Sequence, residues 1–303
     1  MDFRQLETFV TIAKLKSFSK AADHLFLTQP TISNHIQNLE KELGTILINR
    51  SNKKVTLTKA GEILFAHAMD ILNKKEQTLF SLKSFQGKIE GTLEIASSSI
   101  PEQYILPSLL NSFHTLYPDV KFHLLHYDSE QVVDSICNGE IDFGIVGAKN
   151  DTKHLSYIEI MEDTLLMIAP YTDAYKNINE ITLDQLLHEK IILREEGSGT
   201  RKIFEKALAA RNLSMEDFHI IAYIESIESI KQCVRKGLGV SIISQLAVVD
   251  EIKFQLLKAI TIKDLKIKRS FYFVYHKYRA LSPLAETFKN FVVGNKDIIK
   301  NRE

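Results

Sequence analysis

Cysteine, tryptophan and long apolar runs are scarce or missing in this 303-residue sequence, which has two cysteines and no tryptophan. Cys137 and Cys233 are too few for a disulfide scaffold or a cysteine-rich zinc site, and both fall in helical patterns that predict buried thiols. No run of 18 or more apolar residues occurs, which argues against a membrane-spanning helix. The first residues have no basic and apolar signal-peptide pattern, so we expect a cytoplasmic protein without a membrane partner.

Charge is balanced in total but not along the chain. Lys and Arg number 38, as do Asp and Glu, which argues against a polybasic nucleic-acid coat. Residues 1–90 nevertheless carry 13 basic against 9 acidic residues, and the rest of the chain carries 25 against 29. The asymmetry indicates an N-terminal region that faces an anion.

Two regions of different class divide the sequence near Gly87 and Gly91. The N-terminal region is helical in pattern, whereas short apolar runs alternate with helical patterns in the C-terminal region. That alternation is typical of βαβ units and a mostly parallel sheet. We therefore expect an α/β protein with an all-α N-terminal part and strands near 92–96, 120–127, 141–146, 165–169, 190–194, 220–224, 240–243 and 270–275.

The N-terminal pattern predicts short helices over residues 3–14, 17–25 and 29–43, with Gly44 ending the third. Thr28 is placed to cap the third helix, with Pro30 in its first turn, where the missing N–H costs nothing. Two short helices, a tight turn and a polar outer face on the second fit a helix-turn-helix.

Side chains able to bond base edges or phosphates gather on this outer face. The candidate DNA-binding residues are Ser19, Thr28, Gln29, Pro30, Thr31, Ser33, Asn34 and Gln37. Two β-like runs over residues 46–58 then predict a wing whose Arg50, Lys53 and Lys54 would neutralise phosphates. The alternative is a polar face that is merely solvated.

A long helix follows over residues 61–88. Its apolar face is wide and has no evident partner in the small N-terminal region. A second copy of the same helix is the simplest partner, which predicts a dimer.

Residues 1–66 resemble the winged helix-turn-helix of LysR-type transcriptional regulators. The matching stretches are Leu6–Phe9, Ser17–Ala22, Leu25, Thr28–Ser33, Ile36–Glu40, Leu43–Gly44, Leu47, Arg50 and Leu57–Gly61. The sequence differs from the family at Asn34-His35, where the family often has Arg or Lys. The resemblance therefore predicts that this helix contacts DNA bases but does not predict which bases it recognises.

The resemblance implies a domain plan for the whole chain. Residues 1–60 would be the DNA-binding domain, 61–88 the dimerising linker helix, and 91–303 an effector-binding domain similar in fold to periplasmic binding proteins. Lobe I would comprise 91–163 and 269–295, and lobe II 164–268, with crossovers near 161–165 and 267–271. The implied partners are double-stranded DNA, a small-molecule effector, further copies up to a tetramer, and RNA polymerase.

Ligands of open α/β sheets bind at the carboxyl ends of strands, where several polar motifs fall. The candidate effector-binding residues are Ser97, Ser98, Ser99, Gly144, Gly147, Glu196, Ser198, Gly199, Thr200, Arg201, Glu225 and Ser226. Each motif has a structural alternative as a helix cap or tight turn. Arg201 or Arg194 would supply the positive charge for an anion. Glu225 and Glu228 argue against an anion at their corner, and they could instead pair with Arg201, close the lobes or bind an amine. The Gly197–Arg201 loop resembles that of family members governing sulfur or inorganic-anion metabolism, which favours an anionic effector.

The sequence argues against an enzyme and against a transport protein. No nucleophile elbow, paired zinc ligands or Walker loop occurs, and the Gly-Ser-Gly-Thr stretch lacks the Lys-Ser/Thr end of a P-loop. A solute-binding transport protein is opposed by the DNA-binding motif. We expect a sequence-specific DNA-binding regulator controlled by a metabolite between the lobes, with no catalytic residue, metal or cofactor.

Overall fold

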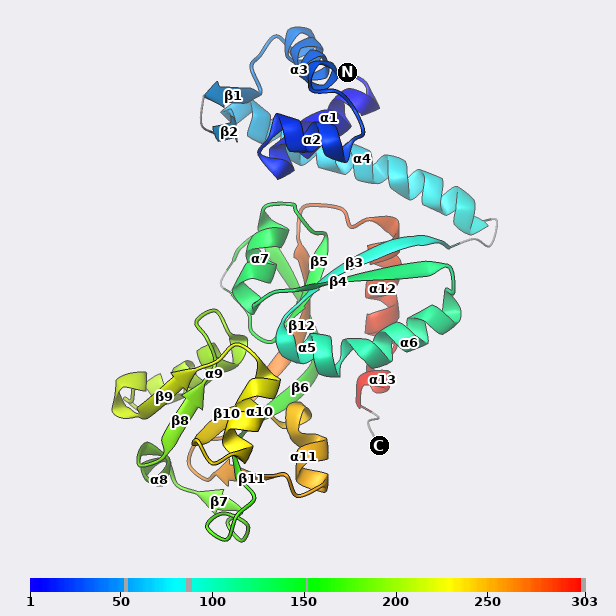
Figure 1. The fold of residues 1–303 in the computed structure, drawn as a ribbon. Coiled ribbons are helices and arrows are strands. Elements are labelled where there is room, and N and C mark those ends of the chain that lie inside the picture. The colour runs from blue at the N-terminus through cyan, green and yellow to red at the C-terminus, as the bar shows by residue number, and fades with distance from the viewer. Residues whose placement is uncertain (52–53, 86–88, 151, 301–303) are drawn as a thin grey trace.

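The computed structural model describes residues 1–51, 54–85, 89–150 and 152–300. A small helical region carries the N-terminus, and a long helix connects it to a larger α/β body of two lobes (Figure 1). No helix in these described ranges is both long and apolar enough to cross a bilayer.

The N-terminal region is a helix-turn-helix with a two-stranded wing. Its elements are α1 (Phe3–Leu15), α2 (Phe18–His24), α3 (Gln29–Leu43), β1 (Ile48–Ser51) and β2 (Lys54–Leu57). The expected caps are present, because the Thr28 side chain accepts from the Thr31 N–H and Gly44 ends α3 at φ 65°. Phe9, Ile12, Ile32, Ile36 and Leu39 are fully buried and join the three helices into one core.

The linker helix α4 (Lys59–Phe85) begins against the wing and then runs along the body. Ala68 and Met69 pack into the core that α1 also lines, and the Gln77 amide donates to the Leu281 carbonyl oxygen at 3.2 Å. The expectation that this helix has no partner in the small N-terminal region was therefore wrong, since α1 covers part of it. The region around α12 (Pro283–Gly294) covers a further part. Apolar side chains on the uncovered part are Ile63, Ile71, Leu79 and Leu82.

One mixed sheet runs through both lobes in the order β4-β3-β5-β12-β6-β10-β8-β9, with β11 beside β6 and β7 beside β11. The bounds are β3 (Gly91–Ser97), β4 (Val120–His126), β5 (Phe143–Val146), β6 (Leu155–Pro170), β7 (Glu180–Ile181), β8 (Lys190–Leu193), β9 (His219–Tyr223), β10 (Val240–Ser244), β11 (Leu257–Ile262) and β12 (Ile267–His276). Strands β3, β4 and β5 are parallel in one lobe, as are β8, β9 and β10 in the other. The sheet is not mostly parallel throughout, because β6 and β12 pair antiparallel at its centre.

Helices cover the sheet of each lobe. They are α5 (Ser99–Tyr104), α6 (Leu106–Leu116), α7 (Ser129–Cys137), α12 and α13 (Lys296–Lys300) in the first lobe, and α8 (Leu183–Leu187), α9 (Gly199–Ala209), α10 (Ile227–Arg235) and α11 (Val249–Lys253) in the second, with 3₁₀ turns at Met215–Asp217 and Gln245–Val248. Figure 1 shows β6 and β12 passing from one lobe to the other. These two strands are the crossovers, and they place the ends of β3, β5 and β8 on facing sides of the gap between the lobes.

Candidate functional site

The outer face of α3 forms the candidate DNA-binding surface. Thr28, Gln29, Pro30, Asn34 and Gln37 are exposed. Thr31 and Ser33 are half-buried, whereas Ser19 on α2 is exposed and donates to the Gln29 side chain at 3.4 Å. Figure 1 shows α3 at the end of the molecule remote from the two lobes, so this polar face is free to meet a groove of DNA.

The wing is fixed to α3 by one carboxylate. Glu40 Oε1 accepts from the backbone N–H of Leu47 at 2.8 Å and from that of Ile48 at 3.2 Å. The wing strands pair from Ile48 opposite Leu57 to Ser51 opposite Lys54. Lys53 lies outside the described residues, as do the side chains of Arg50 and Lys54 on the two strands.

A polar cleft lies where the two lobes meet. Ser98, Ser99, Asp128 and Ser129 line it from lobe I, Arg194, Glu195, Ser198, Gly199 and Thr200 from lobe II, and Arg269 from the crossover β12. The N-termini of α7 and α9 both open into it, and the Ser198 side chain caps α9 by accepting from the Arg201 N–H. The positive ends of the two helix dipoles favour an anion at this place.

Two buried arginines dominate the cleft. Arg269 is 6% exposed, and its Nε donates to Asp163 Oδ2 at 2.8 Å while its Nη1 donates to Thr200 Oγ1 at 3.0 Å. Burial lowers the pKa of Arg269, and the Asp163 carboxylate opposes that shift. Arg194 donates from Nη2 to Ser99 Oγ at 3.0 Å, which bridges the two lobes.

The carboxylates of the cleft already have donors. Both carboxylate oxygens of Glu195 accept hydrogen bonds from the Arg194 guanidinium, at 2.7 Å each. Asp163 also accepts from Ser244, and Asp128 Oδ1 accepts from two backbone N–H groups at the start of α7. The unsatisfied buried atoms of the cleft residues are instead able to donate, because Arg269 Nη2 and Ser129 Oγ have no partner among the described residues.

The lobes are closed on each other in this structure. A Cβ on Gly199 would lie 2.9 Å from Ser129 Oγ and 3.4 Å from Ala148 Cβ, so α9 lies close against lobe I across the gap. The free space in the cleft is about 10 Å³. That is about the room a single water needs, so a metabolite requires the lobes to separate.

The expected effector residues divide into two groups. Ser98, Ser99, Ser198, Gly199 and Thr200 line the cleft together. The others do not line it. Ser97 is buried and donates to the Ile145 carbonyl oxygen, Gly144 packs against Val132 and Ala96, and Gly147 lies beside Arg269. Glu196, Glu225 and Ser226 are exposed.

Of the two cations that the sequence offered, Arg194 lines the cleft and Arg201 does not. Arg201 Nε donates to Glu205 at 2.7 Å, and its guanidinium lies over the Tyr223 ring. Arg269 and Ser129 also line the cleft and were missed from the sequence, as was Asp163, which holds Arg269. Arg269 and Asp163 are register partners on β12 and β6, 106 residues apart in the chain, so only strand pairing could have indicated them.

Comparison with known families agrees with this architecture. Residues 3–62 match the family described as "Bacterial regulatory helix-turn-helix protein, lysR family". Residues 86–296 match the family described as "LysR substrate binding domain". The two matches together cover the winged helix-turn-helix, the start of the linker helix and both lobes.

Curated relatives span nearly the same length. A probable RuBisCO transcriptional regulator of Gracilaria tenuistipitata var. liui is 34% identical over 94% of this chain and 93% of its own. The HTH-type transcriptional regulator CysL of Bacillus subtilis is 30% identical over 96% and 94%.

Solved structures share the fold. A full-length variant of OxyR from Pseudomonas aeruginosa superposes with a TM-score of 0.75 at 20% identity, over 99% of this chain and 95% of that one. The CcmR regulatory domain of Synechocystis, solved in complex with 2-PG, superposes with a TM-score of 0.63 at 27% identity, over 70% and 99%.

A winged helix-turn-helix on a long linker helix, followed by two lobes around a polar cleft, defines a ligand-responsive transcription regulator. The chain belongs to the LysR family of transcriptional regulators. Its curated relatives are regulators of transcription, and its two parts match the DNA-binding and substrate-binding domains of that family.

Proposed function

We propose that this regulator binds an anionic metabolite between its lobes and that the bound metabolite changes how the recognition helices meet DNA. The observation that carries the proposal is the pair of unpartnered buried donors, Arg269 Nη2 and Ser129 Oγ, in a cleft whose carboxylates are already hydrogen-bonded among the described residues. An anion supplies the acceptors that these donors lack. The CcmR regulatory domain, which shares this fold, was solved in complex with 2-PG, and this supports an anionic ligand for the present chain.

The residues proposed to hold the anion come from both lobes. Ser98, Ser99 and Ser129 belong to one lobe, Ser198 and Thr200 to the other, and Arg269 to the crossover between them. Because Arg194 joins the lobes through Ser99 Oγ in the closed arrangement, an anion that takes over these donors stabilises a different spacing of the lobes. A ligand shifts this equilibrium only by its difference in affinity for the two states.

Coupling to DNA runs through the linker helix. We propose the domain plan expected from sequence, with residues 1–60 binding DNA, 61–88 dimerising and 91–303 sensing the effector. The exposed Ile63, Ile71, Leu79 and Leu82 side chains of α4 support the dimer, because a second copy would remove them from water. This control requires neither chemical conversion of the ligand nor a cofactor. The proposed place of action is the cytoplasm, where the protein would meet its DNA target.

Isothermal titration of the full-length protein with 2-phosphoglycolate, and with a panel of other phosphorylated acids, carboxylates and sulfur oxyanions, tests the anion. Ser129→Ala should weaken binding of the ligand by about 10- to 100-fold, because a hydrogen bond to a charged group is worth about 1.5–3 kcal/mol. The same variant should unfold at an unchanged temperature, since the hydroxyl has no partner among the described residues of the closed protein.

Ser229→Ala, on the exposed start of α10, is the matched control and should bind within twofold of the original protein. A DNA fragment from upstream of the regulator's own gene serves for mobility shifts, and Ser129→Ala should bind it normally without the effector. The anion proposal is contradicted if no member of the panel binds, or if Ser129→Ala and Ser229→Ala bind equally.

A further inference from the structure

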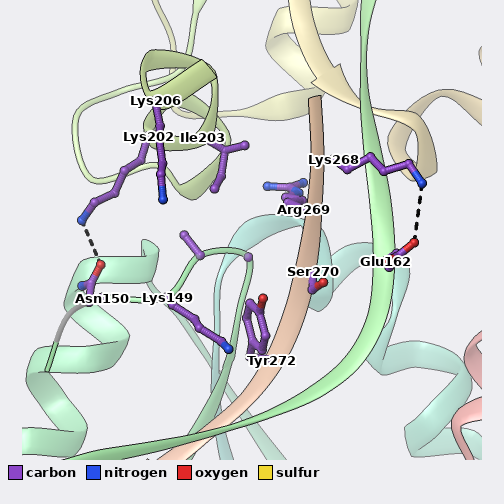
Figure 2. A pocket seen from close by; sticks show the side chains of 12 residues that line it. Lys149, Asn150, Glu162, Lys202, Ile203, Lys206, Lys268, Arg269, Ser270 and Tyr272 are labelled. Atoms are coloured by element: carbon purple, nitrogen blue, oxygen red, sulfur yellow. Dashed lines mark hydrogen bonds and ion pairs between the residues drawn. The ribbon is translucent and has the colours of Figure 1, made fainter. Parts of the chain in front are cut away.

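A second hollow opens on the other side of Arg269 from the cleft, and we refer to it as the basic hollow. Its volume is about 640 Å³, which lies within the range of small-molecule sites. Its polar lining includes Lys149, Lys202, Lys206, Lys268 and Arg269. Figure 2 shows Lys202 and Lys206 reaching from α9 toward the loop that carries Lys149, while Lys268 points away toward Glu162.

Three lysines of the basic hollow have no carboxylate partner among the described residues, whereas Arg269 is paired with Asp163. Glu162 is the one carboxylate among its described lining residues, and it lies 3.8 Å from Lys268 at the rim. Within the described chain, no carboxylate lies within ion-pair distance of Lys149, Lys202 or Lys206. Like charges held around one space raise its potential and favour a ligand with more than one negative charge.

The remaining contacts of these lysines are weak ones that a ligand can replace. Lys202 Nζ donates to Asn150 Oδ1 at 2.8 Å, and Lys149 Nζ lies 4.5 Å from the centre of the Tyr272 ring. The Lys206 ammonium has no hydrogen-bond acceptor among the described residues, although its backbone carbonyl accepts from the Ala210 N–H. Ile203 and the Tyr272 ring form an apolar part of the wall.

The basic hollow spans the two lobes. Lys149 and Asn150 follow β5 in lobe I, whereas Lys202 and Lys206 lie on α9 in lobe II, so the Lys202–Asn150 hydrogen bond crosses between them. Arg269 and Gly147 on its floor are in contact, because a Cβ on Gly147 would lie 3.0 Å from Arg269 Nη1. Arg269 also lines the cleft, so a change on one side reaches the other through one guanidinium.

We propose that the basic hollow is a second ligand site, which takes a small polyanion carrying at least two phosphate groups and clamps the lobes together. The lysines of α9 and of the β5 loop hold the phosphates from opposite lobes. Binding at this site and in the cleft is then coupled, and by thermodynamic linkage each ligand changes the affinity of the other by the same factor.

Isothermal titration of the full-length protein with inorganic pyrophosphate tests the site. We expect the Lys202→Ala/Lys206→Ala double variant to bind at least tenfold more weakly than the original protein. Lys236→Ala/Lys253→Ala removes the same charge from exposed positions of lobe II and should bind within twofold. The cleft variant Ser129→Ala should keep this binding, which separates the second site from the proposed effector site.

Three results would overturn the proposal. They are an absence of binding at millimolar pyrophosphate, an unchanged affinity in the Lys202→Ala/Lys206→Ala variant, and an equal loss in both double variants, which would indicate a general effect of net charge. Alanine suits an exposed helix position, so a matching melting temperature will show that the double variant is folded.

Discussion

Gly61→Ala should loosen the wing, although alanine favours helices. Gly61 lies in the first turn of α4, where a Cβ would come 2.1 Å from the Leu47 carbonyl oxygen and 3.3 Å from Leu57 Cβ. Both neighbours belong to the wing region, and the Leu47 oxygen also accepts from the Thr58 N–H at 2.9 Å. The Leu47 carbonyl belongs to the backbone and cannot rotate away as a side chain can, so α4 and the wing must move apart.

The magnitude follows from three opposing effects. Overpacking costs about 1–3 kcal/mol, and weakening the hydrogen bond to Leu47 adds about 1 kcal/mol. Exchange of glycine for alanine in a helix returns about 1 kcal/mol. The net loss of about 1–3 kcal/mol lowers the melting temperature of a region of this size by at least about 4 °C.

Differential scanning calorimetry measures this loss, and fluorescence anisotropy with promoter DNA measures its effect on the wing. Affinity should fall on every sequence, because the wing is proposed to contact phosphates. Gly294→Ala is the matched control, since nothing lies within 4 Å of its Cβ position in α12 among the described residues. A Gly61→Ala protein that melts at or above the original temperature would refute the reasoning.

Three further predictions concern single side chains. Glu40→Ala should lower the free energy of unfolding in urea by about 1–3 kcal/mol, because two backbone N–H groups lose their acceptor. Glu40→Gln keeps an acceptor oxygen and should retain most of that stability. Burial and the neighbouring Arg279 lower the pKa of His276 to about 4 in the folded protein. As the pH drops from about 6.5 toward 4, His276 of the unfolded chain takes up a proton while that of the folded protein does not, so the free energy of unfolding should fall. His276→Gln should reduce that pH dependence, and the exposed His219→Gln should not; equal slopes would contradict the assignment. Arg50→Ala should weaken DNA binding on all sequences and lower the salt slope by about one, and a loss confined to one base position would show base reading instead.

Local signals determined the N-terminal region. The predicted helix over residues 3–14 is observed as Phe3–Leu15, and the predicted cap at Thr28 and stop at Gly44 are both present. Caps, helix periodicity and a first-turn proline act over a few residues, so the sequence alone specifies them. The strands of the two lobes were also placed closely, except that β6 is much longer than expected and β7 and β11 were missed.

Tertiary structure decided the cleft. The sequence offered Arg201 or Arg194 as the cation because both lie near the Gly-Ser-Gly-Thr loop. The structure places Arg194 in the cleft, whereas Arg201 bonds Glu205 one helical turn further along α9. Arg269 reaches the cleft because β12 pairs with β6 and sets it beside Asp163. Side chains close in sequence can point to opposite faces, and side chains far apart can meet only when strands choose their register. The sequence by itself thus determined which helices form and the class of protein, while the pairing of distant strands decided which charges share a site.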